Sequence, residues 1–374
     1  MFKDLYKKKK VLVTGHTGFK GSWLSLWLKA LGAQIIGYSL EPPSRPNNFE
    51  ACGLQQQVIH IYGDVRDYEH LLAVFKEHKP DIVFHLAAQP LVRLSYKNPI
   101  LTYETNVMGT VNLLEAVRAT DSVRVLVNVT SDKCYENREW VWGYRENDPV
   151  GGYDPYSSSK GCAELVTAAY RQSFFSPERY EDHGVALSSV RAGNVIGGGD
   201  WGADRLIPDC VTAISENRPV LVRNPNAIRP WQHVLDPLYG YLLLGAFMVQ
   251  SGADYASAWN FGPSDSEVLT VEEVVKRFIQ YWGKGTFARS PNPPFRESPL
   301  SAISDSPASL HEAHLLKLDC SKAHNLLGWI PLYRIEQALK ETAEWYRLFY
   351  SGAGKEEIYQ ENRRQILEYM ENLR

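Results

Sequence analysis

The chain has 374 residues, of which 44% are hydrophobic and 22% charged, a composition that excludes disordered and fibrous proteins. Its 40 basic and 43 acidic residues give a net charge of −3, so nothing predicts a general attraction to nucleic acid or to an anionic membrane. Five cysteines without a CxxC pair predict neither a disulfide framework nor a metal site. The start lacks the pattern of a signal peptide and no apolar run has membrane-spanning length, so we expect a soluble protein of the reducing cytoplasm.

The first half of the sequence alternates short β-branched runs with helical patterns, which predicts βαβ units and a parallel sheet. The expected strands are 10–14, 34–40, 58–62, 81–87, 124–130 and 185–191. The expected helices are 22–31, 68–78, 99–119 and 156–175. This order predicts an α/β fold with a doubly wound parallel sheet in residues 1–190.

Beyond residue 191 the alternation fails, and glycine and proline become frequent. We expect residues 191–374 to form mainly a smaller, mixed C-terminal domain. Part of 233–262 is expected to join the first domain.

The first expected strand leads through a glycine-rich loop, TGHTGFKG at 14–21, directly into a helix. Glycines spaced three and three permit a tight turn and a close backbone approach, so a pyrophosphate can lie on the N–H groups of the helix N-terminus. The order strand, loop, helix favours a dinucleotide in a Rossmann domain over a purely structural turn. The loop residues expected to contact it are Gly15, Thr17, Gly18, Phe19 and Gly21.

The residues after the second and third strands indicate which dinucleotide is bound. Glu41 is the acidic candidate for the ribose hydroxyls, and it could equally be a loop charge. No lysine or arginine lies between the second strand and Arg45, which favours NAD over NADP. Asp64 and Val65 could bracket the adenine, although Asp64 could equally cap the following helix.

The sharpest catalytic pattern joins Ser131, just after the fifth strand, to Tyr156 and Lys160 in the next helix. A tyrosine and a lysine four residues apart lie on one helix face. There an ammonium and a nearby nicotinamide charge would lower the phenol pKa enough for it to act as a base, and the Ser131 hydroxyl would share the substrate oxygen. The alternative is a pair on the helix surface without a function.

Several further strings make the chain resemble the extended short-chain dehydrogenase/reductase family over nearly its whole length. They are HLAAQ at 85–89, TNVMGT at 105–110, RAGNVIG at 191–197 and RPWQHVLD at 229–236. The resemblance implies an NAD-dependent enzyme of nucleotide sugars, whose C-terminal domain binds the nucleotide sugar. It also implies that Ala87, Ala88 and Asn106 contact the cofactor, together with Tyr156 and Lys160.

Within that family, TSDKCY at 130–135, GGGDWGADRLIPD at 197–209 and KLDCSKA at 317–323 are most similar to 4,6-dehydratases. The implied reaction converts CDP-D-glucose to CDP-4-dehydro-6-deoxy-D-glucose with loss of water, in deoxysugar biosynthesis of the lipopolysaccharide O-antigen type. The choice of cytidine rests on the resemblance alone.

Asp132 and Lys133 are the residues that decide between reactions. Adjacent side chains in a strand point to opposite faces, so both can serve one site only if the chain has turned out of the sheet. Related dehydratases carry an Asp-Glu pair here, which implies that Asp132 is the acid at the C6 hydroxyl. Lys133 stands where the glutamate base is expected, which leaves the C5 base open. The alternative is that Asp132 caps a turn and Lys133 is solvated.

Arg205 and Arg229 are candidates for the pyrophosphate of the substrate, because two phosphates in a protein of this charge need local guanidinium groups. Arg205 could equally lie on the surface. Asn194 and Gln89 complete the substrate residues that the resemblance implies.

Two other functions remain open on the sequence. One is a 4-epimerase, or a dehydratase for another nucleotide sugar, although epimerases typically lack the aspartate. The other is a nonenzymatic NAD-sensing regulator, but such proteins commonly lose the Tyr-Lys pair. Family analogy also implies a homo-oligomer, with a dimer built from helices 99–119 and 156–175.

Overall fold

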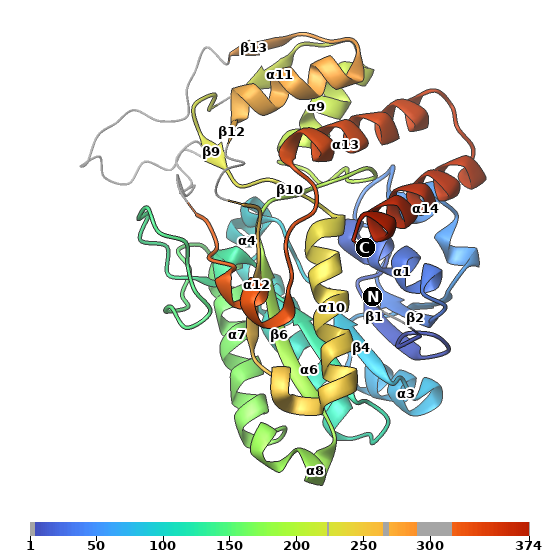
Figure 1. The fold of residues 1–374 in the computed structure, drawn as a ribbon, viewed down its shortest axis with the longest axis vertical. Helices are drawn as coiled ribbons and strands as arrows, with labels where there is room; N and C mark the ends of the chain where they lie inside the picture. Colours follow the sequence, from blue (N-terminus) through green and yellow to red (C-terminus); the bar gives the residue numbers. More distant parts are fainter. Residues whose placement is uncertain (1–3, 223, 265–268, 290–315, 374) are drawn as a thin grey trace.

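The centre of the molecule is a seven-stranded parallel sheet (Figure 1), in a computed structural model that describes residues 4–222, 224–264, 269–289 and 316–373. The strand order is β11-β6-β5-β4-β1-β2-β3. The strands are β1 (Lys10–Thr14), β2 (Gln34–Ser39), β3 (Ile59–Tyr62), β4 (Ile82–His85), β5 (Val125–Val129), β6 (Ala186–Ala192) and β11 (Ala258–Phe261). The six strands expected from the sequence all form, and the doubly wound α/β fold is confirmed.

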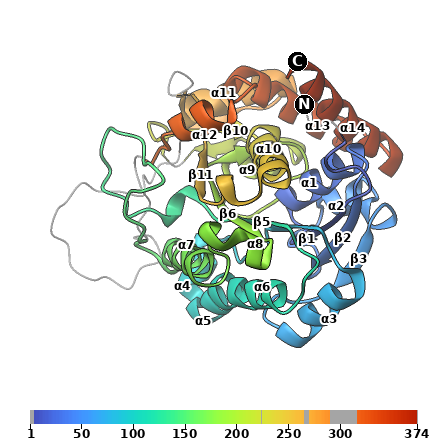
Figure 2. The same ribbon diagram turned by 60° about the horizontal axis from the view of Figure 1, so that its bottom comes forward.

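The strand β1 illustrates why the sheet is buried on both faces. Val11 and Val13 pack on one side and Leu12 on the other, as the two-residue period of a strand requires. Helices cover both faces (Figure 2). The Val11 side carries α1 (Phe19–Ala30), α10 (Leu235–Ser251) and α14 (Lys355–Asn372), and the Leu12 side carries α3 (Tyr68–His78), α6 (Gly109–Arg118) and α7 (Pro155–Ser173).

Two expected helices differ in detail from the structure. The helix expected to start at residue 22 starts at Phe19, because Gly18 already has the extended conformation of a cap. The helix expected at 99–119 is α5 (Pro99–Tyr103), a π-helical segment η2 (Glu104–Met108) and α6 in succession. Such π-helical segments often occur at functional positions, and this one carries Asn106.

The C-terminal half contributes to both parts of the molecule. The helix α10 covers the sheet, β11 extends it beside β6, and α14 packs on α1, where the rings of Trp27 and Tyr369 are 5.4 Å apart. The division of the chain near residue 190 stays a prediction.

The remaining elements are short strand pairs and helices, many of them gathered at one end of the molecule in Figure 1. The strands pair as β7 (Val195–Ile196) with β10 (Gln232–His233), β8 (Val220–Val222) with β13 (Phe287–Arg289), and β9 (Ile228–Arg229) with β12 (Leu269–Thr270). The helices are α2 (Asn48–Ala51), α4 (Val92–Lys97), α8 (Tyr180–His183), α9 (Leu206–Ser215), α11 (Val271–Trp282), α12 (Ser321–Leu327) and α13 (Ile335–Tyr350). Throughout the described ranges, no helix combines the length and the apolarity needed to cross a membrane.

Candidate active site

The loop between β1 and α1 is built around three glycines, two of which leave no room for a side chain. Gly15 has φ +73°, and a Cβ there would lie 2.7 Å from the amide nitrogen of Ala87, in the same loop as Ala88. A Cβ on Gly21 would lie 2.1 Å from the carbonyl oxygen of Gly15. Gly18 caps α1 without any side-chain bond. This bare helix N-terminus fits a dinucleotide pyrophosphate, as the sequence predicts.

The other predicted cofactor residues near this loop have partners of their own. The Thr17 hydroxyl donates to the carbonyl oxygen of Leu40 over 3.0 Å, which ties the glycine loop to the end of β2. The Asp64 carboxylate pairs with Arg66 at 2.6 Å. The idea that Asp64 caps the following helix is wrong, because Asp67 caps α3.

The π-helical segment η2 fixes the loop that follows β4. Asn106 accepts a hydrogen bond from the Gln89 backbone at 2.8 Å and donates to Ser159 of α7 at 2.8 Å. The side chain of Gln89 is engaged within the protein, because it donates to Thr102 at 2.9 Å and accepts from the Leu91 backbone at 2.6 Å. Its contact with the substrate stays a prediction. In the structure, the hydrogen bonds of the Gln89 side chain hold the loop after β4 in place. Val65 is buried against Gly109, one residue beyond η2.

The start of α7 sets the position of the tyrosine and the lysine. Asp154 caps the helix and Pro155 occupies its first turn, so the helix begins immediately before Tyr156. Lys160 follows one turn later on the same face. The Tyr156 backbone donates to the Ser95 hydroxyl of α4 at 3.1 Å, which holds the first turn in place. The side chains of Tyr156 and Lys160 are both buried.

Burial moves the pKa of both side chains. It raises the pKa of Tyr156 to about 12, and a hydrogen bond with Ser131 opposes the shift. It lowers the pKa of Lys160 to about 8, against the charge of Glu164. The Lys160 ammonium donates to the Val129 carbonyl at 3.3 Å. The tyrosine therefore needs a further positive charge nearby to become a base at neutral pH.

The chain turns out of the sheet after β5, which brings Asp132 and Lys133 into reach of one site. Both lie in the 3₁₀ turn η3 (Asp132–Cys134), capped by Ser131, whose hydroxyl accepts the Lys133 N–H at 3.2 Å. That hydroxyl also donates to Oδ1 of Asp132 at 3.0 Å. A Cβ on Gly193, the residue after β6, would lie 2.9 Å from Oδ2 of Asp132, so the backbone there also packs closely on the carboxyl. Burial raises the pKa of Asp132, and the Lys133 charge is the first influence opposing it.

Glu164, one turn beyond Lys160, forms a buried ion pair that sequence reasoning missed. It accepts from Arg191 at 2.8 Å and from the Ser189 hydroxyl at 2.7 Å, and both charged side chains are 4% exposed. It also accepts from Thr130, the residue before Ser131. The signal was its spacing of four from Lys160, which places it on the same helix face.

The predicted substrate residues after β6 occupy different surroundings. Arg205 pairs with Asp200 at 2.8 Å, and its charge is one of the influences that lower the pKa of Tyr156. Asn194 is half-buried beside β7. Arg229 ends β9, where it donates to the Ile228 carbonyl at 3.1 Å, and its contact with substrate stays a prediction.

Lys20 is a further site residue that sequence reasoning missed. It lies in the first turn of α1, and its charge acts on Asp132. The sequence feature that could have indicated Lys20 is its position inside the glycine motif TGHTGFKG at 14–21.

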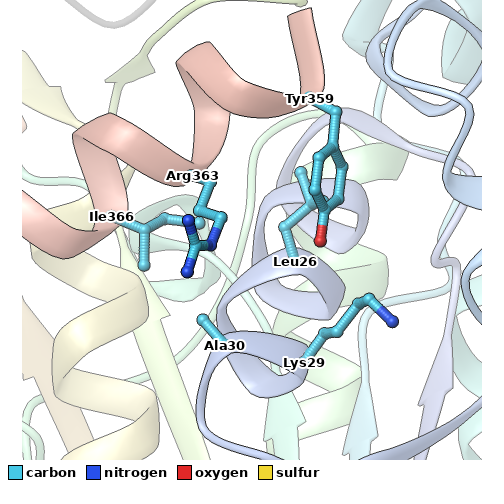
Figure 3. Close-up of a pocket in the computed structure, with 6 residues that line it drawn as sticks. All are labelled: Leu26, Lys29, Ala30, Tyr359, Arg363 and Ile366. Atoms are coloured by element: carbon cyan, nitrogen blue, oxygen red, sulfur yellow. The ribbon is translucent and has the colours of Figure 1, made fainter. Parts of the chain in front are cut away.

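A shallow cavity of about 240 Å³ lies elsewhere, between α1 and α14 (Figure 3). Leu26, Lys29, Ala30, Tyr359, Arg363 and Ile366 line it. Its α1 residues belong to the last part of the helix, whereas the glycine loop is at the first turn. This cavity is therefore separate from the catalytic groups.

Comparisons with known proteins agree with this geometry. Residues 12–342 match the family model described as GDP-mannose 4,6 dehydratase. A CDP-glucose 4,6-dehydratase of Salmonella typhimurium is 52% identical over 368 residues, which are 98% of each chain. A UDP-glucose 4-epimerase of Thermus thermophilus solved with NAD has a TM-score of 0.71 and 25% identity, over 90% of this chain and 99% of that one. A dTDP-glucose 4,6-dehydratase of Bacillus anthracis solved with NAD shares the fold, with a TM-score of 0.69 and 24% identity over 90% and 96% of the chains.

Proposed function

Because the chain belongs to the family described as GDP-mannose 4,6 dehydratase, we propose that it converts CDP-D-glucose to CDP-4-dehydro-6-deoxy-D-glucose and water with bound NAD. The observation that carries the reaction is the buried Asp132, joined to Ser131 beside the Tyr156–Lys160 pair. A dehydration needs a proton donor for the departing hydroxyl, whereas inversion at C4 does not. The substrate follows from the relative that is 52% identical. The product is a precursor in deoxysugar biosynthesis.

The glycine loop and the loop after β4 would hold the cofactor. Gly15, Gly18 and Phe19 form the cradle at the N-terminus of α1, and Ala87 closes it from the side. Bound NAD would supply a hydride acceptor at the sugar C4 and later a hydride donor at C6. Its nicotinamide charge would also supply the positive charge that Tyr156 needs.

Tyr156 takes the proton of the C4 hydroxyl, and the Ser131 hydroxyl holds the same oxygen. Lys160 supports the phenolate from one helical turn away. The ketone formed at C4 makes the proton on C5 acidic. Asp132 then protonates the C6 hydroxyl as it leaves, a role supported by the burial that raises the pKa of this carboxyl. A base near Asp132 takes the C5 proton, and Lys133 is the candidate that the sequence offers.

The proton balance gives Ser131 a second role. In each turnover Tyr156 gains the proton of the C4 hydroxyl, and Asp132 loses a proton to the departing water. The Ser131 hydroxyl donates to Asp132, and the Ser131 side chain also lowers the pKa of Tyr156, so in this proposal it passes the proton from the phenol to the carboxyl. The site can therefore reset without taking a proton from bulk water.

Arg205 and Arg229 bind the two phosphates of the substrate, and Asn194 and Gln89 help to position it. The ion pair of Arg205 with Asp200 fixes the guanidinium on the side of Tyr156, which supports this assignment for Arg205.

Mass spectrometry of the product tests the function. With CDP-glucose the product should be lighter by one water, and dTDP-glucose, UDP-glucose and GDP-mannose should react far more slowly. An isomer of unchanged mass would instead show a 4-epimerase. Bound NAD without turnover of any of the four sugars would point to a regulator.

The homo-oligomer and the cytoplasmic location belong to the same proposal. Ile100 of α5, Met108 of η2 and Leu165 of α7 are exposed apolar side chains, which supports a dimer through these helices. Light scattering of the purified protein measures this directly. The five cysteines are all free, which suits a reducing compartment.

A further inference from the structure

The segment 130–135, which contains η3, is held at both of its ends by one buried ion pair. At its start, the Thr130 hydroxyl donates to Oε1 of Glu164. At its end, the Tyr135 hydroxyl accepts from Nη1 of Arg191 at 2.6 Å. Arg191 also donates to Oε2 of Glu164 at 2.8 Å, so the two ends of the segment are joined through the pair. These four side chains together form a clamp on the segment.

The clamp is anchored in three different elements. Arg191 belongs to β6, which pairs with β5 in the sheet. Glu164 belongs to α7 and also accepts from the Ser189 hydroxyl of β6 at 2.7 Å. The Tyr135 hydroxyl donates in turn to Oδ1 of Asn260 in β11 at 2.8 Å. The segment is therefore tied by side chains to two strands of the sheet and to the helix that carries the tyrosine and the lysine of the site.

The backbone of α7 also packs closely on the end of η3. A Cβ on Gly161 would lie 3.3 Å from the carbonyl oxygen of Cys134 and 2.6 Å from that of Gly151. The Gly151 N–H donates to the same Cys134 oxygen at 2.8 Å. Gly161 directly follows Lys160, so helix and turn are in contact beside this lysine.

Stability alone does not account for a clamp built on charges. Removing two charges from water is costly, and apolar side chains of similar size often give a fold equal or greater stability. Burial acts to raise the pKa of Glu164, but the Arg191 charge and the hydrogen bonds from Arg191, Thr130 and Ser189 lower it. The carboxylate therefore stays ionised and keeps accepting from the segment at neutral pH.

The proposed reaction places a geometric demand on these elements. Asp132 of η3 must reach the C6 hydroxyl while Tyr156 of α7 reaches the C4 hydroxyl of the same sugar. The spacing of the two protein groups must therefore match a spacing that the sugar ring fixes. An error of about 1 Å in such a position can cost about 100-fold in rate.

We infer that the clamp positions Asp132 for the release of water, by fixing η3 relative to α7. This assignment rests on the proposed function. Glu164 and Arg191 act through Thr130 and Tyr135, and they exchange no proton with the sugar. They are positioning residues, and their effect should appear in the rate of one step rather than in substrate binding.

The test compares Tyr135→Phe with the wild type, both loaded with NAD. The variant removes one hydroxyl from the clamp and leaves the groups that act at C4 unchanged, so oxidation at C4 should continue. Release of water should slow about 100-fold, because Asp132 loses its fixed position. Adding CDP-glucose should therefore raise the absorbance of reduced cofactor and lower kcat, whereas KM should stay near the wild-type value.

Tyr144→Phe is the matched control. The Tyr144 ring is also buried, and it stacks on the ring of Tyr135 with their centroids 5.1 Å apart. Its hydroxyl bonds to Asn137 at 3.1 Å and accepts from the Arg138 backbone, outside the clamp. This variant should show a similar loss of stability in urea unfolding, but the wild-type kcat and no build-up of reduced cofactor.

A second pair of variants tests the other end of the segment. Thr130→Val keeps the shape of the side chain but loses the hydroxyl that bonds to Glu164, whereas Thr130→Ser keeps it. The valine variant should lower kcat and the serine variant should retain most of it. Equal rates for these two variants would overturn the inference.

The inference is also overturned if Tyr135→Phe has the same kcat as Tyr144→Phe, or if it loses stability without any build-up of reduced cofactor. Either result would leave the clamp with a structural role only. Failure of the wild type to release water from CDP-glucose would refute the proposed function itself, so the two failures are distinct.

Discussion

The hydroxyl of Ser131 donates a hydrogen bond to Oδ1 of Asp132 over 3.0 Å. The Ser131 side chain also lowers the pKa of Tyr156, so one side chain acts both on the group that gains a proton at C4 in the proposed reaction and on the group that loses one at C6. The two half-reactions of a dehydration are therefore connected through a single oxygen.

Ser131→Ala removes that link and should slow both the oxidation at C4 and the return of the proton to Asp132. We expect turnover to fall about 100-fold or more, whereas Ser131→Thr, which keeps a hydroxyl, should retain a large part of it. Steady-state rates and single-turnover rates with CDP-glucose measure the two effects. Equal activity of the alanine and threonine variants would contradict a role for the hydroxyl.

Tyr156→Phe should keep the fold and NAD binding but abolish turnover, because it removes only the oxygen that accepts the C4 proton. The loss should be about 100- to 10,000-fold. No reduced cofactor should accumulate when substrate is added. A variant with nearly the wild-type rate would remove Tyr156 from the mechanism.

Arg229→Ala should chiefly raise KM, since the phosphates it is predicted to bind do not react. Initial rates over a range of CDP-glucose concentrations separate KM from kcat. An unchanged KM with a large fall in kcat would contradict phosphate binding by Arg229.

Glu164→Gln should destabilise the protein by about 3–5 kcal/mol, because it leaves the Arg191 charge buried without its counter-ion. Urea unfolding followed by circular dichroism measures the free energy. The matched control is Glu216→Gln, which breaks an exposed pair with Arg218 and should cost about 1 kcal/mol or less. Similar losses in the two variants would show that the Glu164 pair contributes no more than a surface pair.

Three buried histidines should make the fold sensitive to acid. Burial lowers the pKa of His16, His85 and His233 to about 3, from an ordinary value of 6.5. Between these values the unfolded chain binds more protons than the folded one. The contribution of these neutral histidines to the free energy of unfolding is therefore complete above about pH 6.5, and it decreases as the pH drops toward 3. Each histidine contributes a slope of up to about 1.4 kcal/mol per pH unit.

Urea unfolding from pH 7 down to pH 4.5 measures that slope. His233→Gln should reduce this slope by about the contribution of one histidine. His324→Gln, at an exposed position, should leave the slope unchanged. A wild-type stability that is constant over this range would refute neutral burial of these rings.

The sequence by itself determined the features that depend on short-range pattern. The continuous apolar run of β1 and the spacing of Gly15, Gly18 and Gly21 are local, so strand, loop and helix could be predicted in order. The four-residue spacing of Tyr156 and Lys160 likewise places both on one face of α7. Backbone periodicity fixes such relationships before any distant segment is packed.

Only the tertiary structure decided how these segments meet and what charge they carry. It brought Asn106 of η2 to Ser159 of α7, and it paired Glu164 of α7 with Arg191 of β6. The structure also shows that Asp67 is the N-cap of α3, whereas Asp64 forms an ion pair with Arg66. No periodic pattern encodes these contacts, because they join different elements across the sheet. Desolvation also depends on tertiary structure. The pKa of a lysine is set by the groups that surround its amine, and only packing determines which groups those are.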